Sequence, residues 1–331
     1  SKRYPPSTRK DLRKEVIVLS KALVKQQPKF SAMINTTGYQ QMIASTLRDP
    51  DRQKRFVASI TSAVANTPAL ATCNPATILA GGLLGEGLNL SPSPQLGQYY
   101  LVPFKCKVKG PDGKVIQQNG QDLVEYKAQF VLGYKGYVQL AERSGQYKHL
   151  NVVELKEGEF HGFNRLNEEL IDYVPIDDFD VWENADTVAY YAFFEYMNGF
   201  QKAICWTKDQ MLSHADRYSK AFSRQAYQKI LNHEIPDRDI WKYSSFWYKD
   251  FDRMAEKTML RHLISRWGIM STEMQMAFSH DNSFADINED NGDVVVHVEE
   301  EVDIEPPDDS EPVQPDVPEE KKVGEISLAD L

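Results

Sequence analysis

Three lysines alternate with apolar residues in the stretch FKCKVKG, and their spacing suits the binding of a polyanion. Lys105, Lys107 and Lys109 are each two residues apart, so on a β-strand their side chains share one face at a spacing of about 6.7 Å. Such a row can follow a sugar-phosphate backbone without reading the base sequence. Lys127 extends the row from the predicted neighbouring strand. The pattern therefore predicts a backbone-binding face on a β-hairpin.

Two helical segments carry further basic rows. In MLSHADRYSKAFSRQ the cations are spaced i, i+3 and i+7, which places them on one face of a single helix; they are Arg217, Lys220 and Arg224. In the segment 246–267 a cation recurs every fourth residue, at Lys249, Arg253, Lys257 and Arg261. A single row of this kind is more often a solvated surface. Several rows on separate elements favour a nucleic-acid groove.

One pattern offers an enzymatic alternative. Pro111-Asp112 followed by Glu125-Tyr126-Lys127 fits the loose PD…ExK pattern of metal-dependent nucleases. In such nucleases two carboxylates hold Mg²⁺ and the lysine steadies the attacking water. The pattern fixes few residues across a variable gap, and Pro-Asp-Gly is also an ordinary turn. A Mg²⁺-dependent DNA nuclease is the alternative function.

The sequence lacks the common motifs for nucleotide binding, metal binding and disulfide bonding. The stretch GGLLGEGLNL has no GK[ST], and Leu90 stands where a dinucleotide fingerprint needs its third glycine. The seven histidines show no HExxH spacing. Cys73, Cys106 and Cys205 show no CxxC spacing, which argues against a zinc site and a disulfide framework. We expect no nucleotide and no required cofactor, with Mg²⁺ acting at most as a counterion of DNA.

The net charge of −10 over 331 residues is unevenly distributed. Residues 281–331 contain 18 acidic and two basic residues, so residues 1–280 carry a net charge of +6. The proline-rich run EPPDDSEPVQPDVPEE has too little apolar surface to offset the entropy of ordering. We expect residues 281–331 to be an acidic disordered tail, which either competes in cis with a bound polyanion or only adds solubility. Without an apolar run of 18 residues, a cytoplasmic protein is expected.

The order of predicted elements is helices, then strands, then helices, which indicates an α+β fold. Helices are expected at 12–23, at 56–64 up to Thr67-Pro68, at 75–87, at 133–145, within 211–225 and at 246–267; strands are expected at 100–108, 124–132, 147–155, 187–196 and 200–206. Asn198-Gly199 predicts a hairpin turn, and Thr207 to Gln210 matches a capping box.

Four long motifs resemble those of the phage RecT family of single-strand annealing proteins. They are LNLSPSPQLGQYYLVPF, VLGYKGYVQLAERSG, HADRYSKAF and WYKDFDRMAEKTMLRHLI, in this order from about residue 50 to 270. The resemblance implies a small curved antiparallel sheet with β-hairpins packed against helices, similar to Red beta. It also implies an annealing domain over residues 1–280, with an oligomerising helical part at 1–50 and a RecT-like core at 51–270.

The resemblance further implies the activity and the partners. Proteins of this family bind single-stranded DNA and pair it with a complementary strand without ATP, through an annealed duplex intermediate. They work as homo-oligomeric rings or helical filaments beside a phage 5′-3′ exonuclease, with a host single-strand binding protein as a further partner. DNA lies in a positively charged groove along the oligomer, and no membrane is involved.

Most of the candidate cations fall within these motifs. Lys105 and Lys107 follow YLVPF, and Lys135 lies in GYKG. The remaining matched cations are Arg217 and Lys220 in RYSKA, and Arg253, Lys257 and Arg261 in DFDRMAEKTMLR. The resemblance implies contacts between these side chains and DNA phosphates. Residues 225–243 are longer than the corresponding family linker, and the acidic segment is longer than the resemblance requires.

Overall fold

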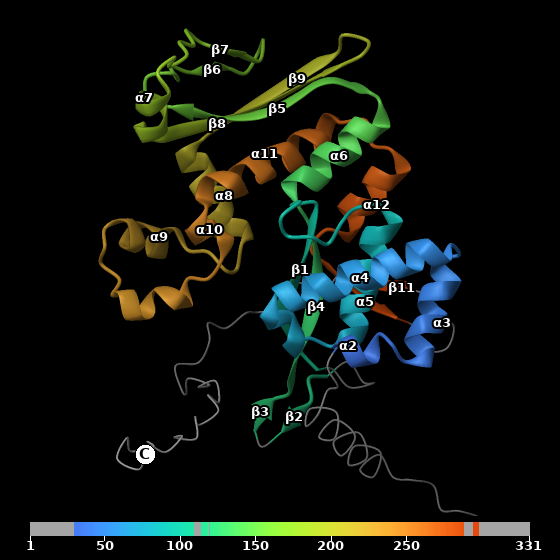
Figure 1. Ribbon diagram of the computed structural model, residues 1–331. Helices are drawn as coiled ribbons and strands as arrows, with labels where there is room; N and C mark the ends of the chain where they lie inside the picture. Colours follow the sequence, from blue (N-terminus) through green and yellow to red (C-terminus); the bar gives the residue numbers. More distant parts are fainter. Residues whose placement is uncertain (1–29, 109–113, 119, 288–293, 298–331) are drawn as a thin grey trace, which may run out of the picture.

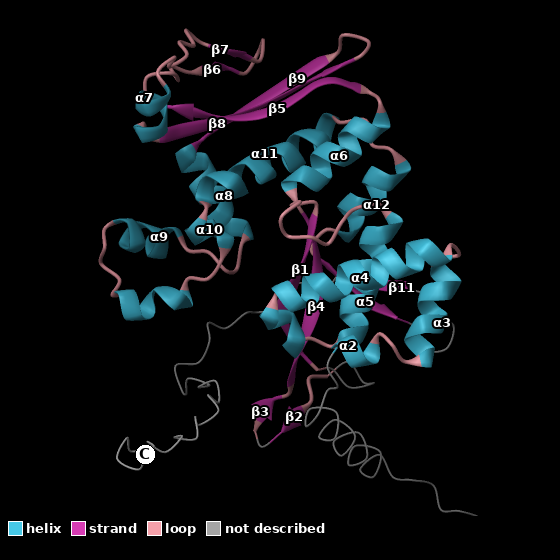
Figure 2. Cartoon of the chain, in the orientation of Figure 1, coloured by secondary structure: helices cyan, strands magenta, loops and turns pink. Residues whose placement is uncertain are grey.

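The computed structural model describes residues 30–108, 114–118, 120–287 and 294–297. Within these ranges, the two larger antiparallel sheets lie in different halves of the molecule with helices between and around them, and two further sheets have two strands each (Figure 1, Figure 2). The predicted α+β class is confirmed. The helix predicted at residues 12–23 lies outside the described residues.

The first described elements are helical. They are α2 (Phe30–Met33), α3 (Thr37–Thr46), α4 (Pro50–Asn66), the 3-10 turn η1 (Pro68–Thr72) and α5 (Pro75–Gly87). Asp49 starts α4 by accepting from the Asp51 N–H, and Asn74 starts α5 by accepting from the Ala76 N–H. A proline follows each cap at the first helical position, where its missing N–H costs nothing. The predictions of α4 and α5 are confirmed.

The glycines of α5 let this helix pack directly on its neighbours. A Cβ at Gly81 would lie 2.7 Å from Cδ2 of Leu101, and one at Gly82 would lie 2.9 Å from Cδ1 of Ile60. A Cβ at Gly85 would overlap the ring of Tyr99. Only glycine permits such close approach, so the glycine run serves helix packing.

The four-stranded sheet has the strand order β1-β4-β10-β11. Its strands are β1 (Tyr99–Lys107), β4 (Val124–Leu132), β10 (Ser283–Ile287) and β11 (Val294–His297). β1 and β4 form the predicted hairpin, which continues into β2 (Gln117–Gln118) and β3 (Gln121–Asp122) toward its tip (Figure 1). The prediction of this hairpin is confirmed.

The sheet also contains residues that were predicted to be tail. Ser283 lies opposite Phe130 in the β10–β4 pair, and both Asp281 and Ser283 are buried. The expectation of a disordered tail from residue 281 is therefore wrong for 281–287 and 294–297. Composition averaged over 51 residues hides these short strands, because their stability comes from pairing with residues far away in the sequence. Residues 298–331 lie outside the described residues.

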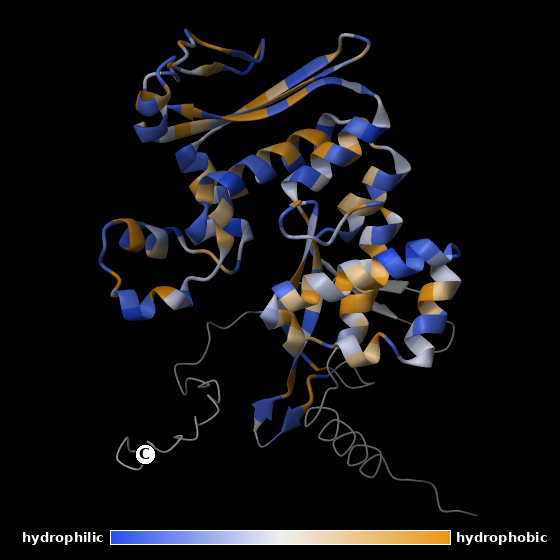
Figure 3. Cartoon of the chain, in the orientation of Figure 1, coloured by the Kyte–Doolittle hydropathy of each residue, from blue (hydrophilic) through white to orange (hydrophobic). Residues whose placement is uncertain are grey.

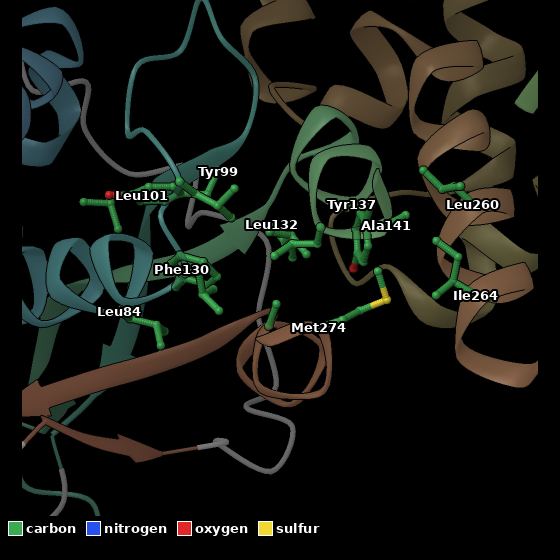
Figure 4. Packing of buried hydrophobic residues seen from close by; sticks show 14 of the residues in the cluster. Leu84, Tyr99, Leu101, Phe130, Leu132, Tyr137, Ala141, Leu260, Ile264 and Met274 are labelled. Carbon is green, nitrogen blue, oxygen red and sulfur yellow. The ribbon is translucent and has the colours of Figure 1, made fainter. Parts of the chain in front are cut away.

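Two helices join this sheet to the rest of the core. α6 (Tyr134–Ser144) follows β4 directly, as predicted between Gly133 and Gly145, and α12 (Thr272–His280) precedes β10. Figure 4 shows Tyr137 of α6 and Met274 of α12 between the hairpin and Ile264 of the later helix α11. These side chains belong to one continuous hydrophobic cluster.

The second sheet has three strands in the order β5-β8-β9. They are β5 (Tyr147–Lys156), β8 (Thr187–Tyr196) and β9 (Gln201–Thr207), with β6 (Phe163–Asn164), β7 (Glu169–Leu170) and α7 (Phe179–Asn184) in the β5–β8 connection. Buried and partly exposed residues alternate along most of β8, because one face of the sheet packs on helices; hydrophobic and hydrophilic residues are interspersed along the three strands (Figure 3). The β8–β9 hairpin turns at Asn198-Gly199, as predicted; Gly199 has φ +86°.

The helices that follow the second sheet lie on one side of it. They are α8 (Lys208–Tyr218), α9 (Arg224–Leu231), the 3-10 turn η2 (Asp237–Lys242), α10 (Phe246–Lys249) and α11 (Phe251–Trp267). The predicted capping box is present, since Thr207 and Gln210 bond each other's backbone N–H. The single helix predicted at 246–267 is interrupted at Asp250 (φ −153°), whose side chain caps α11 at the Arg253 N–H. α11 packs under the sheet and beside α6 (Figure 1).

Candidate nucleic-acid interface

The hairpin lysines differ in their surroundings. Lys105 and Lys107 share one face of β1, as predicted, and Lys105 is exposed. The ammonium of Lys107 lies 3.1 Å from Oδ2 of Asp122 near the hairpin tip, and this side chain is only about one third exposed (36%). Hydrogen bonds from Gln117 and Lys107 lower the pKa of Asp122, which keeps its carboxylate charged. Lys109 lies outside the described residues.

Lys127 does not extend this row. In the β1–β4 register Lys127 is opposite Phe104, whereas Lys105 is opposite Tyr126. Residues directly opposite each other point to the same face of a sheet, so Lys127 stands on the other face. The prediction is wrong because it placed the lysine by proximity without knowing the register.

Lys127 instead pairs with the carboxylate of the nuclease pattern. Its ammonium is 3.5 Å from Oε1 of Glu125, two residues earlier on the same strand. Asp112, the other carboxylate of the pattern, lies outside the described residues. Within the described part of the chain, no group of three or more His, Cys, Asp or Glu side chains is arranged to hold a metal ion.

The GYKG motif joins β4 to α6 and presents Lys135. The Gly133 N–H donates to the carbonyl oxygen of Gln98 at 2.8 Å. A Cβ at Gly133 or Gly136 would overlap the backbone at Gly97 and Gln98, so both glycines are needed for this approach. Lys135, between them, is exposed. The motif therefore fixes the position of one surface cation.

Arg217, Lys220 and Arg224 do not share one helical face. α8 ends at Tyr218 and α9 begins at Arg224, so the predicted single helix is broken. The Arg224 guanidinium forms an ion pair with Asp209 and donates to Oγ of Ser213 at 3.1 Å. The predicted row of three is therefore wrong, because the chain turns back to bring Arg224 onto the side of α8. Arg217 and Lys220 remain exposed.

The cations of α11 have carboxylate neighbours. Nη1 of Arg253 lies 3.1 Å from Oε2 of Glu256, whose pKa is raised mainly by burial. Nε of Arg261 lies 3.5 Å from Oδ2 of Asp281. Burial lowers the pKa of Lys257, and the nearby Asp281 opposes this shift. The predicted basic row therefore consists of exposed Arg253 and Arg261 with a partly buried Lys257 between them.

Asp281, which follows α12, contacts residues of β4, α6 and α11. Its carboxylate is 1% exposed and accepts from the Leu132 N–H at 2.8 Å and from the Tyr137 hydroxyl at 2.6 Å. Burial and the carboxylate together raise the pKa of Tyr137, which keeps the hydroxyl protonated. Arg261 therefore also joins α11 to β4, α6 and the start of β10.

The structure sorts the ten predicted cations into two groups. The exposed side chains are Lys105, Lys135, Arg217, Lys220, Arg253 and Arg261; the partly buried ones are Lys107, Lys127, Arg224 and Lys257. Exposed cations can reach a phosphate while staying hydrated, and two of them, Arg253 and Arg261, also pair with carboxylates of the fold. The second group is held mainly by contacts within the fold.

A model of the RecT family matches residues 54–295, which include all ten cations. The chain belongs to the RecT family. It is 32% identical over 280 residues to YqaK, an uncharacterized protein of Bacillus subtilis (strain 168), a match that covers 84% of this chain and 79% of YqaK. It is 26% identical over 280 residues to Protein RecT of Escherichia coli (strain K12), covering 84% of this chain and 89% of that protein.

Membership in the RecT family makes this a DNA-binding protein of recombination by single-strand annealing. The recognised motifs thus have a common origin with those of the family. The matched region includes α11, the three-stranded sheet and the four-stranded sheet up to residue 295 in β11. In the part of the RecT-family chain that the structure describes, no helix has the length and apolar composition that a bilayer crossing requires.

Five rings on three elements form a group that the sequence analysis did not identify. Trp206 of β9 lies 5.0 Å from His214 of α8 and 4.9 Å from His262 of α11, measured between ring centroids. Tyr218 continues the chain at 4.7 Å from His214, and Trp267 lies 6.2 Å from His262. We call these five residues the aromatic cluster. The His214–Tyr218 and His262–Trp267 contacts each lie within one helix, four and five residues apart, whereas the contacts of Trp206 with His214 and His262 join separate elements.

Proposed function

We propose that this RecT-family protein pairs complementary single strands of DNA without ATP and without making or breaking a covalent bond. The family match over residues 54–295 carries the proposal. The six exposed cations within it support a surface that binds phosphates along one strand. Binding to the backbone alone leaves the bases available to a second strand.

Catalysis in this proposal is concentration and alignment. Phosphates of one strand are held by the exposed cations with the bases turned outward, and a second strand samples those bases. Adjacent copies of the chain, in a ring or a helical filament, retain the correctly paired duplex. Holding both strands in one assembly raises their effective concentration, so pairing requires no chemical energy.

The packing of α5 supports independence from nucleotide. The glycine-rich stretch, the best candidate for a phosphate loop in the sequence, forms a helix packed against Leu101, Ile60 and Tyr99. Its backbone N–H groups are used in the helix, and its glycines are used in packing. We therefore propose no required cofactor, with Mg²⁺ acting only as a counterion of DNA.

The activity also defines the partners. A protein that anneals strands needs single-stranded ends, which a 5′-3′ exonuclease supplies by degrading one strand of a duplex. A host single-strand binding protein covers the same strands and is the second proposed partner. These steps take place in the cytoplasm of a bacterial cell.

An annealing assay tests the function. Two fluorescently labelled complementary strands are mixed with the protein in the absence of nucleotide, with and without Mg²⁺, and the products are separated on native and denaturing gels. We expect faster duplex formation than without protein, with both strands at full length. Fragments that appear only with Mg²⁺ and disappear in Glu125→Ala would support the nuclease alternative instead. The absence of any faster pairing would refute annealing.

A further inference from the structure

The aromatic cluster differs from the aromatic packing of the nearby core. Phe222, Trp247 and Phe251 also contact one another, but each is at most 7% exposed. In contrast, Tyr218 at the end of α8 is 69% exposed. The other four rings of the cluster are partly exposed. The cluster therefore presents ring surface to solvent at the place where α8 approaches α11 and β9.

Cations surround these rings. Nζ of Lys202, which also pairs with Glu168, lies 4.7 Å from the ring centroid of Trp267, and Cζ of Arg266 lies 5.4 Å from it. Arg217 precedes Tyr218 in the chain and is exposed. Arg261 is close enough to His214 to lower the pKa of this imidazole, after the larger effect of burial. The exposed side chains of Arg217 and Arg266 therefore place positive charge at two positions beside the cluster.

Rings with adjacent cations are the two components that bind single strands without sequence preference. Bases stack on aromatic side chains because every base has a π-face, and basic side chains hold the phosphates between them. A duplex cannot use the rings, since its bases are stacked on one another. A surface of this composition therefore favours unpaired over paired DNA.

We propose that the aromatic cluster is a base-stacking site for single-stranded DNA, with Tyr218 as its outermost ring and Arg217 and Arg266 contacting the phosphates on either side. This inference rests on the proposed function, because it assigns a site for the bases to a protein that binds single strands. It adds a contact to the base itself, which the backbone-binding cations do not supply.

The test compares an oligothymidylate with an abasic oligonucleotide of the same length, which keeps the phosphates and lacks the bases. Binding of each labelled strand to the full chain is measured by fluorescence anisotropy. We expect wild type to prefer the strand with bases, and Tyr218→Ala to weaken its binding about tenfold, as for the loss of one base–aromatic stack. Binding of the abasic strand should not change in Tyr218→Ala.

Two control variants separate stacking from other effects. Tyr218→Phe keeps the ring and should bind as wild type does, because stacking does not need the hydroxyl. Trp241→Ala removes a ring that is 66% exposed but belongs to η2, outside the aromatic cluster, and should also bind as wild type does. Thermal melts of all variants check that each is folded, as expected for changes at exposed side chains.

The outcomes are distinct. Equal affinity of wild type for both strands overturns the stacking site while leaving DNA binding intact. An equal loss of both affinities in Tyr218→Ala also overturns it, since that result indicates altered phosphate binding. Wild type that binds neither strand refutes the proposed function together with the inference.

Discussion

Asp281 shows how one buried carboxylate can position several residues. It accepts hydrogen bonds from the backbone of Leu132 and the hydroxyl of Tyr137, and it lies 3.5 Å from the guanidinium of Arg261. A buried charge is stable only when its hydrogen-bonding capacity is met. Here three elements meet that requirement together, so the carboxylate links β4, α6 and α11.

Replacing this carboxylate should destabilise the whole fold. Asp281→Ala leaves the Leu132 N–H and the Tyr137 hydroxyl without an acceptor and removes the counter-charge of Arg261 and Lys257. We expect the free energy of unfolding to fall by about 3–5 kcal/mol, measured by urea denaturation. Asp177→Ala removes an exposed carboxylate and should change it by about 0.5 kcal/mol or less. Equal effects of the two changes would show that the buried network contributes nothing.

The candidate cations show what spacing can and cannot predict at this scale. Alternation correctly placed Lys105 and Lys107 on one face of a strand. The carboxylate partners of Lys107 and Arg224 could not be predicted, because Asp122 and Asp209 lie 15 residues away in each case and approach only after folding. The contacts of Trp206 with His214 and His262, which assemble the aromatic cluster, also form only after folding.

At the scale of elements, two glycines of α5 have different surroundings. Gly85 faces the Tyr99 ring, whereas a Cβ at Gly87 on the same helix would meet no atom within 4 Å. Gly85→Ala should therefore lower the free energy of unfolding by about 1–3 kcal/mol through overpacking. Gly87→Ala should raise it by about 0.5–1 kcal/mol, since alanine favours the helix more than glycine does.

Denaturant unfolding of both variants measures this difference directly. The two changes add the same methyl group two residues apart, so the helix preference itself is matched. If both variants gain stability, the helix does not lie as close to Tyr99 as the structure has it.

Elements were predictable where their signals are local. The capping box at Thr207, the turn at Gly199 and the strands β1 and β4 depend on signals within a few residues, and all were predicted. The break between α8 and α9 was not, because Ser219 to Ser223 carry no proline or glycine. At the break Phe222 is buried against Trp247 and Phe251, and the Ser223 side chain caps α9 by accepting from the Ala226 N–H. The contacts of Phe222 join separate elements, so the local sequence does not reveal them.

At the scale of the whole molecule, the acidic segment begins before the fold ends. The fold includes residues up to His297, whereas the charge already changes sign at about residue 281. Residues 298–331 still contain 13 acidic and two basic residues. A test of competition between this acidic segment and DNA must therefore remove it after His297, not after His280.

Two truncations separate the contribution of residues 281–297 to stability from the effect of residues 298–331 on DNA binding. A chain that ends at His297 should melt as the full chain does and bind single-stranded DNA more tightly, because negative charge near the cations is removed. A chain that ends at His280 loses Asp281, β10 and β11 and should melt at a lower temperature. Thermal melts and DNA titrations measure both effects. Unchanged DNA affinity in the His297 chain would favour a solubilising or docking role for the segment.

The central claim is that the exposed cations bind the DNA backbone, whereas the partly buried cations are held by contacts within the fold. The most direct test is the salt dependence of single-strand binding in two double variants of equal charge, Lys105→Ala/Arg217→Ala and Lys107→Ala/Arg224→Ala. Each removes one cation from β1 and one from the α8–α9 region. The slope of log affinity against log salt reports how many phosphates are neutralised, at about 0.7 per contact on single strands. The account predicts that the first variant lowers the slope by about 1.4 and that the second leaves it nearly unchanged; equal losses in both variants, or a larger loss in the second, would contradict it.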